Sequence, residues 1–107
     1  CQIDWWRFTN ANSGEIFDFK GPMAHGHASE CGTSVMLYLY PELADCSEMT
    51  RVEPKENSFP DVLQYGHFTE KTPNGTLGDA TVATREKGEA IVNVCLDRIM
   101  EYLNTAF

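Results

Sequence analysis

The clearest hydrophobic pattern in the chain lies near its C-terminus. Apolar residues recur there at steps of three and four positions, the spacing of one helix face: Ala90, Ile91, Val94, Cys95, Ile99, Tyr102 and Leu103. Thr84 precedes this run as an N-cap residue, and Glu86 adds negative charge to the first turn. Gly88 costs a helix about 1 kcal/mol relative to Ala, so we expect it to permit close packing. The pattern predicts a long amphipathic helix that packs its apolar face against a sheet and turns Glu101 outward.

A second apolar run ends before Pro41. From Glu30 to Tyr40 the apolar residues are nearly continuous, which predicts a helix buried on most sides. A buried strand is the alternative for residues 35–40, but the length of the whole run favours the helix. Residues 45–76 are polar and are broken by three prolines. A loop this long is usually functional or a contact surface.

The N-terminal segment has a weaker pattern. Residues 2–9 (Q-I-D-W-W-R-F-T) are rich in aromatic side chains and predict a strand or the end of one. Residues 10–14 predict a turn, and residues 15–20 predict a short strand or a loop before the Gly21-Pro22 break. The 107 residues fit one domain, 1–107.

Composition and charge narrow the range of functions. The net charge of -8 repels phosphate backbones, so we expect no nucleic-acid partner. No apolar run approaches the roughly 20 residues that span a bilayer, so we expect no membrane association. The four cysteines form no C-x-x-C pair, and Cys31 and Cys95 lie in apolar helical patterns, which predicts reduced thiols and a cytoplasmic protein. The chain begins with Cys1 instead of Met, which suggests a cut, a split subunit or a trimmed chain.

The densest group of reactive side chains is His25, His27 and Glu30. Histidine and carboxylate within one turn can converge on Zn²⁺ or Mn²⁺, and histidine can also serve as a general acid or base. The alternative is that these residues only cap the start of a helix. Trp5 and Trp6 form a second group that could floor a pocket for a planar ligand or anchor the core.

Two separated motifs resemble those of the creatininase (creatinine amidohydrolase) family. Residues 27–37 read H-A-S-E-C-G-T-S-V-M-L, followed by P-E-L at 41–43, and are similar to the family's H-A-G-E-x-E-T-S-x-M-L and P-E-L. Residues 75–89 read G-T-L-G-D-A-T-V-A-T-R-E-K-G-E and are similar to the family's G-x-x-G-D-x-x-x-A-x-x-E-K-G-E. The resemblance covers most of this chain but only the C-terminal half of a family member.

The resemblance implies an α/β fold, a three-layer α/β/α arrangement with a parallel sheet of which this chain is the C-terminal portion. It implies a metal-dependent hydrolase of a small cyclic amide or related C–N substrate, assembled as a homo-hexamer. Two divalent metal ions (Zn or Mn) would be held mostly by residues outside this chain, in an N-terminal half or a partner chain. On this resemblance His27 is the catalytic proton shuttle and Glu30 a metal ligand. Trp6 matches a substrate-facing Trp, and we place Trp5 and His25 beside it as substrate-binding residues.

The chain also departs from the family pattern. Ser29 replaces the motif's Gly and Gly32 replaces its second Glu, while creatininases proper carry Trp and Asp where this chain has Met23 and Ala24. These departures imply an altered pocket for the planar substrate. Two alternatives therefore stay open, a hydrolase of a cyclic ketone such as an inositol-derived inosose, and a non-catalytic oligomer-forming fragment. A hydrolase that uses Cys1 as an N-terminal nucleophile is a further and weaker alternative.

Overall fold

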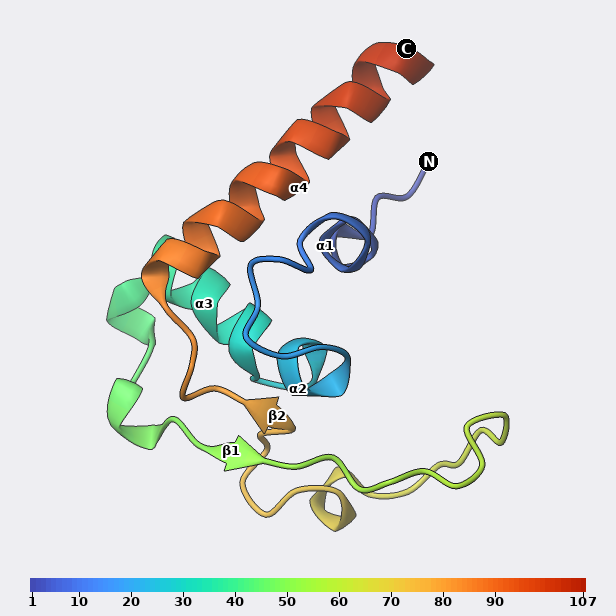
Figure 1. Cartoon of the computed structure of the whole chain (residues 1–107), viewed down its shortest axis with the longest axis vertical. Helices are drawn as coiled ribbons and strands as arrows, with labels where there is room; N and C mark the ends of the chain where they lie inside the picture. Colours follow the sequence, from blue (N-terminus) through green and yellow to red (C-terminus); the bar gives the residue numbers. More distant parts are fainter.

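The computed structural model describes all residues, 1–107. Its helices are α1 (Trp5–Asn12), α2 (Pro22–His25), α3 (Glu30–Leu39) and α4 (Arg85–Ala106), with the short 3-10 turns η1 (Pro41–Leu43), η2 (Cys46–Glu48) and η3 (Phe68–Glu70); the strands are β1 (Arg51–Val52) and β2 (Gly78–Asp79). Figure 1 shows α4 as a long rod with α1 and α3 against it, and the segment between β1 and β2 running out as an arm.

Both helices predicted from the hydrophobic pattern are confirmed, but the expectation that α3 is buried on most sides is wrong, because Met36 and Leu39 are exposed and only one side of the helix is buried. Helix α3 begins at Glu30 and ends at Leu39, just before Pro41, which cannot continue it. Helix α4 follows Thr84, whose side-chain oxygen accepts a hydrogen bond from the backbone N–H of Lys87 at 3.1 Å. Thr84 is therefore the N-cap that its position in the sequence predicts.

The strand predicted for residues 2–9 is wrong, because residues 5–9 lie in helix α1, which also takes in residues 10–12 of the predicted turn at 10–14. Asp4 caps the helix by accepting a hydrogen bond from the backbone N–H of Trp6 at 3.1 Å. The aromatic residues that favour a strand pack against α4 instead, so tertiary contacts override their local preference. Residues 15–20 form turns and bends without a strand.

The strands β1 and β2 are antiparallel, with Arg51 opposite Asp79 and Val52 opposite Gly78. No parallel pair of strands forms within these residues, so the chain does not show the expected three-layer arrangement by itself. Two strands of two residues each cannot cover the apolar face of a 22-residue helix. Helix α4 therefore packs on α1 and α3, which corrects the expectation that it packs on a sheet.

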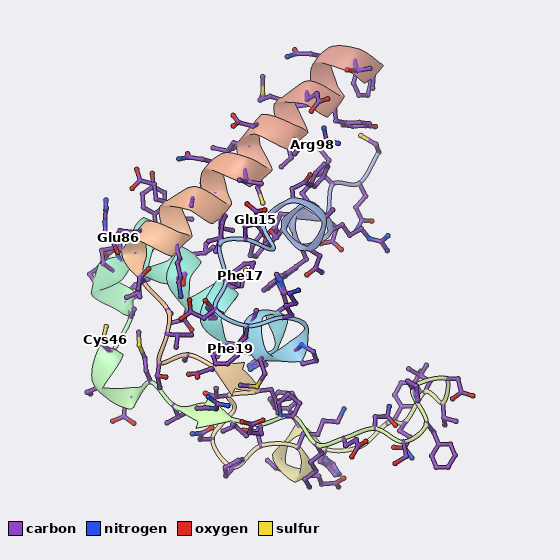
Figure 2. The ribbon with its side chains drawn as sticks, in the orientation of Figure 1. Glu15, Phe17, Phe19, Cys46, Glu86 and Arg98 are labelled. Carbon is purple, nitrogen blue, oxygen red and sulfur yellow. The ribbon has the colours of Figure 1, made fainter.

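The core is small and lies where the three helices meet. Cys31, Ile91 and Cys95 form its buried centre, and partly buried side chains surround it: Trp5, Trp6, Phe8, Ile16, Phe17 and Val35. In Figure 2 Phe17 points into the space between the helices, while Glu86 points outward. Gly88 permits the close approach of α3 and α4, because a Cβ there would lie 1.9 Å from the backbone oxygen of Ser34. The expectation that Gly88 serves close packing is confirmed.

The long segment between η1 and β2 is mostly irregular, as the sequence predicts. Every residue from 55 to 71 is exposed, including the large apolar side chains of Phe59, Leu63 and Tyr65. No helix combines the length and the hydropathy that crossing a lipid bilayer requires.

Candidate functional site

His27 lies on the turn between α2 and α3, with its side chain exposed. Its backbone oxygen accepts a hydrogen bond from the N–H of Leu77 at 2.8 Å, and its Nδ1 lies 2.6 Å from the carbonyl oxygen of Gly75. A carbonyl oxygen can only accept, so Nδ1 carries the proton and donates it. This leaves Nε2 of the neutral ring with a free lone pair.

Two glycines allow this turn to lie close against the segment that contains strand β2. A Cβ at Gly26 would lie 1.9 Å from the carbonyl oxygen of Leu77, and one at Gly78 would lie 2.6 Å from that of Met23. Gly78 also has a φ of +110°, which side chains disfavour. The backbone around His27 and the backbone at residues 77–78 therefore approach each other more closely than residues with a Cβ would allow.

Ala28, directly after His27, has a left-handed backbone with a φ of +49°. Few non-glycine residues adopt this conformation, and each one persists only where its surroundings fix it. Ser29 supplies one such constraint, because its buried hydroxyl donates a hydrogen bond to the carbonyl of Ala24 at 2.7 Å. Strain of this kind is common at functional sites.

Glu30 is completely buried, and its carboxylate is surrounded by donors. It accepts hydrogen bonds from the backbone N–H of Asp18 at 2.8 Å and of Phe19 at 3.4 Å, and it pairs with the ammonium of Lys87 at 2.7 Å. The same ammonium lies 3.0 Å from the Asp18 carboxylate and 2.8 Å from the carbonyl oxygen of Val82. Burial lowers the pKa of Lys87, but the hydrogen bonds and charges of Glu30 and Asp18 raise it overall.

His25 belongs to an aromatic cluster on the other side of this turn. Its ring packs edge-on against Phe17 and Trp6, with distances between ring centroids of 4.6 Å and 6.3 Å. Trp6 in turn stacks on Trp5, with their ring centroids 4.3 Å apart. Its Nδ1 is buried and has no hydrogen-bond partner. Burial lowers the pKa of His25 by more than the negative charge of Glu30 raises it. The imidazole is therefore stabilised in its neutral form. The structure thus brings His25, Trp5 and Trp6 together, while His27 contacts a different segment.

A shallow groove of about 800 Å³ passes beside this cluster, lined by His25, Phe17 and residues 10–16. A smaller pocket of about 260 Å³ lies next to His27, with Ala28, Gly32 and Thr76 in its wall. At Gly32 an added Cβ would meet only the Trp6 ring, at 4.0 Å. At the position where the creatininase motif carries a second Glu, a side chain would therefore begin in ordinary van der Waals contact with Trp6, without a clash.

The family model for creatininase (creatinine amidohydrolase) matches residues 1–103. The chain belongs to the creatininase family. A creatinine amidohydrolase from Pseudomonas putida is 38% identical over 84 residues, which is 78% of this chain and 31% of that protein.

Solved creatininase structures have the same fold over nearly the whole chain. A manganese form aligns with a TM-score of 0.78 at 30% identity, and a variant of Zn–Zn type with 0.76 at 28%; each covers 98% of this chain and 42% of the creatininase. A creatininase variant complexed with creatine aligns with a TM-score of 0.75 at 29% identity and covers 97% and 42%. The chain thus spans less than half the length of these relatives, which are α/β proteins.

The residues of this chain do not by themselves form the metal centre of a creatininase. No group of three or more His, Cys, Asp or Glu side chains is close enough to hold a metal ion. The side chain of His27 points to Gly75, while Glu30 faces Lys87, so the two do not converge. The geometry favours Glu30 as the counter-ion of Lys87 over the metal ligand expected from the creatininase motif.

Three residues that contact His27 or belong to the ion cluster of Glu30 are not predicted from the sequence. The rings of Phe68 and His27 meet edge-on with their centroids 4.8 Å apart, and Lys87 is the centre of a partly buried ion cluster in which it pairs with Asp18 and Glu30. Lys87 stands in the second creatininase motif, which was a usable signal. Phe68 lies in a polar loop 41 positions after His27, and no local pattern indicates that the two rings meet.

Proposed function

We propose that this chain is the C-terminal part of a metal-dependent hydrolase that opens a small cyclic amide or a related C–N bond, with His27 moving the proton. Membership of the creatininase family supports the hydrolase class. The observation that carries the role of His27 is its geometry, an exposed ring whose Nδ1–H is held by the Gly75 carbonyl and whose Nε2 is free.

This geometry suits both halves of amide hydrolysis. Water must lose a proton as its oxygen bonds to the carbonyl carbon, and the nitrogen must gain one as the C–N bond breaks. Nε2 of a neutral imidazole can accept the first proton and then donate it to the leaving nitrogen. The Gly75 carbonyl keeps the second ring nitrogen protonated throughout, and its dipole stabilises the imidazolium that forms in between.

Divalent metal ions belong to this proposal, because the structural relatives include manganese and Zn–Zn forms. Two such ions would take most of their ligands from outside these 107 residues, in an N-terminal part of the polypeptide or a partner chain. Their contribution would be to polarise the carbonyl and to lower the pKa of bound water. A homo-hexameric assembly and a cytoplasmic location stay predictions.

Trp5, Trp6 and His25 are proposed as one side of the substrate pocket. They present a half-buried aromatic surface, which suits a planar ring of the kind that creatinine and related cyclic amides share. The creatine complex of one relative supports this substrate class. Gly32 lacks the carboxylate of the motif's second Glu, which favours a substrate of different shape, so a cyclic ketone stays the second candidate.

The test replaces His27 in the full-length protein. His27→Asn keeps a side-chain N–H for the Gly75 carbonyl but offers no base, and His27→Ala removes both. We expect both variants to lower kcat by roughly 100-fold or more at normal metal content. The assay panel contains creatinine, other five-membered cyclic amides, N-formyl compounds and an inosose. Full activity in His27→Asn would refute the role of His27, and turnover of the inosose alone would replace the amide with the ketone.

A further inference from the structure

Beneath the His27 turn lies a partly buried charge that the proposed reaction does not use. Lys87, in the first turn of α4, reaches three parts of the chain: the start of α3 through Glu30, the segment after α1 through Asp18, and the loop before α4 through the Val82 carbonyl. The Lys87 side chain is 17% exposed and Glu30 is 0% exposed, so water screens their ion pair little, whereas the contact with Asp18, which is 55% exposed, is screened more.

The contacts of Glu30 complete the cluster. Its two oxygens already accept from two backbone N–H groups and from the Lys87 ammonium, and none of its surface reaches solvent. A buried carboxylate is tolerable when it is paired and hydrogen-bonded in this way. A cation at Glu30 would first have to displace the ammonium, which makes a structural counter-ion the better account of this residue.

The cluster is connected to His27 through only two residues. Ala28 holds its left-handed φ of +49°, and Ser29 is buried and bonded to the Ala24 carbonyl. One end of the turn is fixed by the hydrogen bond from the Leu77 N–H to the His27 carbonyl. The other end is fixed where Glu30 meets Lys87, since α3 begins at Glu30.

We propose that Lys87 is a positioning residue, which acts through Glu30 to hold the strained turn at Ala28 and so aims His27 at the Gly75 carbonyl with Nε2 toward substrate. This inference rests on the proposed role of His27 and deepens it. It joins the two creatininase motifs physically, because the carboxylate comes from the first and the ammonium from the second.

The experiment compares Lys87→Met, Glu30→Gln and the double variant in the full-length protein. We expect each single change to lower kcat by ~10–100-fold, since small misplacements of catalytic groups have costs of this order. The double variant should be no worse than the singles, because all three break one connection. Metal content should stay normal in all of them. Arg85→Met, an exposed residue of the same helical turn, is the matched control and should leave kcat unchanged.

A spectroscopic readout separates positioning from stability alone. In protein labelled with ¹⁵N-histidine, the Nδ1–H signal of His27 should identify its tautomer in the unaltered protein and in Arg85→Met, and be lost in Lys87→Met. A lowered melting temperature with unchanged kcat per folded molecule and an unchanged signal would overturn the proposal. So would loss of metal in Glu30→Gln alone, which would make Glu30 a ligand.

The two proposals can fail separately. If His27→Asn keeps its activity, the role of His27 in the reaction is refuted, while the ¹⁵N signal still reports whether Lys87 orients the ring. If Lys87→Met does not fold, Glu30→Gln carries the same test, because its amide oxygen can still accept from the Asp18 N–H.

Discussion

Charge and conformation act together over the four residues from His27 to Glu30. His27 is exposed and Glu30 has no exposed surface, although they stand one helical turn apart in sequence. The left-handed backbone at Ala28 produces this difference, because it redirects the chain between an outward ring and an inward carboxylate. Both residues could be named from the sequence. Their opposite environments could not, since they depend on Gly75 and Lys87, which lie far along the chain.

The thiols provide a residue-scale prediction. Cys31 and Cys95 are buried and unpaired, while Cys1 and Cys46 are exposed. Burial, with added repulsion from Cys95 and Glu30, raises the pKa of Cys31 to about 12, so almost none of it is the reactive thiolate at pH 8. We expect a thiol reagent at pH 8 to modify Cys1 and Cys46 in seconds to minutes, and the other two only after denaturant is added. Peptide mapping by mass spectrometry identifies the sites, and rapid labelling of Cys31 in the native protein would contradict its burial.

His25 provides a prediction about pH. Its folded-state pKa lies below the ordinary value of 6.5, so protonation favours the unfolded chain. The stability that neutral His25 contributes is therefore complete above pH 6.5 and declines as the pH falls from 6.5 toward the folded-state pKa. The slope in that window is at most about 1.4 kcal/mol per pH unit.

The measurement compares the full-length protein with its His25→Leu variant in denaturant titrations at pH 8, 6 and 5. Other titrating groups act equally in both proteins, so the difference between them isolates His25. We expect the free energy of unfolding to fall less in His25→Leu than in the unaltered protein as the pH is lowered. Parallel pH dependences would show that His25 is not held neutral in its aromatic cluster.

At the scale of elements, the packing of α1, α3 and α4 decides the structure more than local preference does. Helices α3 and α4 could be predicted because long periodic runs carry a strong signal, and Thr84 marks the start of α4. Helix α1 was missed because its aromatic residues also suit a strand. Asp4 was the overlooked signal, an N-cap residue directly before the helix. The two-residue strands lie below what any periodic pattern can reveal.

Gly88 is the sharpest test of the α3–α4 crossing. Ala is the better helix former by about 1 kcal/mol, so an unpacked helix would gain stability from Gly88→Ala. Here the new Cβ would meet the Ser34 backbone at 1.9 Å, and backbone cannot rotate away. We expect a net loss of roughly 1–3 kcal/mol, the usual range for overpacking. Gly14→Ala is the matched control, because a Cβ there meets nothing within 4 Å. Chemical denaturation of the full-length protein measures both variants, and a stabilised Gly88→Ala would mean that the two helices do not approach so closely.

At the scale of the whole molecule, the chain exposes more surface than a domain of its size should. Its accessible surface is 7541 Å², against about 6,000 Å² for a folded monomer of 12.0 kDa. Its radius of gyration is 15.1 Å, against about 13 Å for a compact domain of this length. Only five hydrophobic residues are buried, while fourteen large ones are exposed. Sequence composition does not predict this large exposed surface, because an ordinary fraction of apolar residues does not reveal how many of them the chain can bury.

The exposed apolar residues lie mainly on the arm, on the end of α3 with η1, and on the outer part of α4. Phe59, Leu63 and Tyr65 are 64%, 77% and 88% exposed on the arm, and Leu96 and Met100 are about half exposed on the helix. Large apolar side chains exposed on a folded surface mark interaction sites or sources of aggregation where they gather into patches. The solved creatininases are more than twice as long as this chain, so the rest of such a protein, or another copy, could cover these side chains.

On the proposal that these 107 residues are the C-terminal part of a longer hydrolase, they should therefore behave differently when studied alone than in the full-length protein. We expect the isolated chain to bind a hydrophobic dye such as ANS strongly, to associate as its concentration rises, and to unfold with little cooperativity. The reason is that a core of five buried hydrophobic side chains offsets little of the entropy lost on ordering the chain. The full-length protein should bind little dye and unfold cooperatively. Dye fluorescence, sedimentation and urea titration of both proteins test this together. A monomeric isolated chain that unfolds in one sharp transition without binding dye would show that its apolar surface needs no cover.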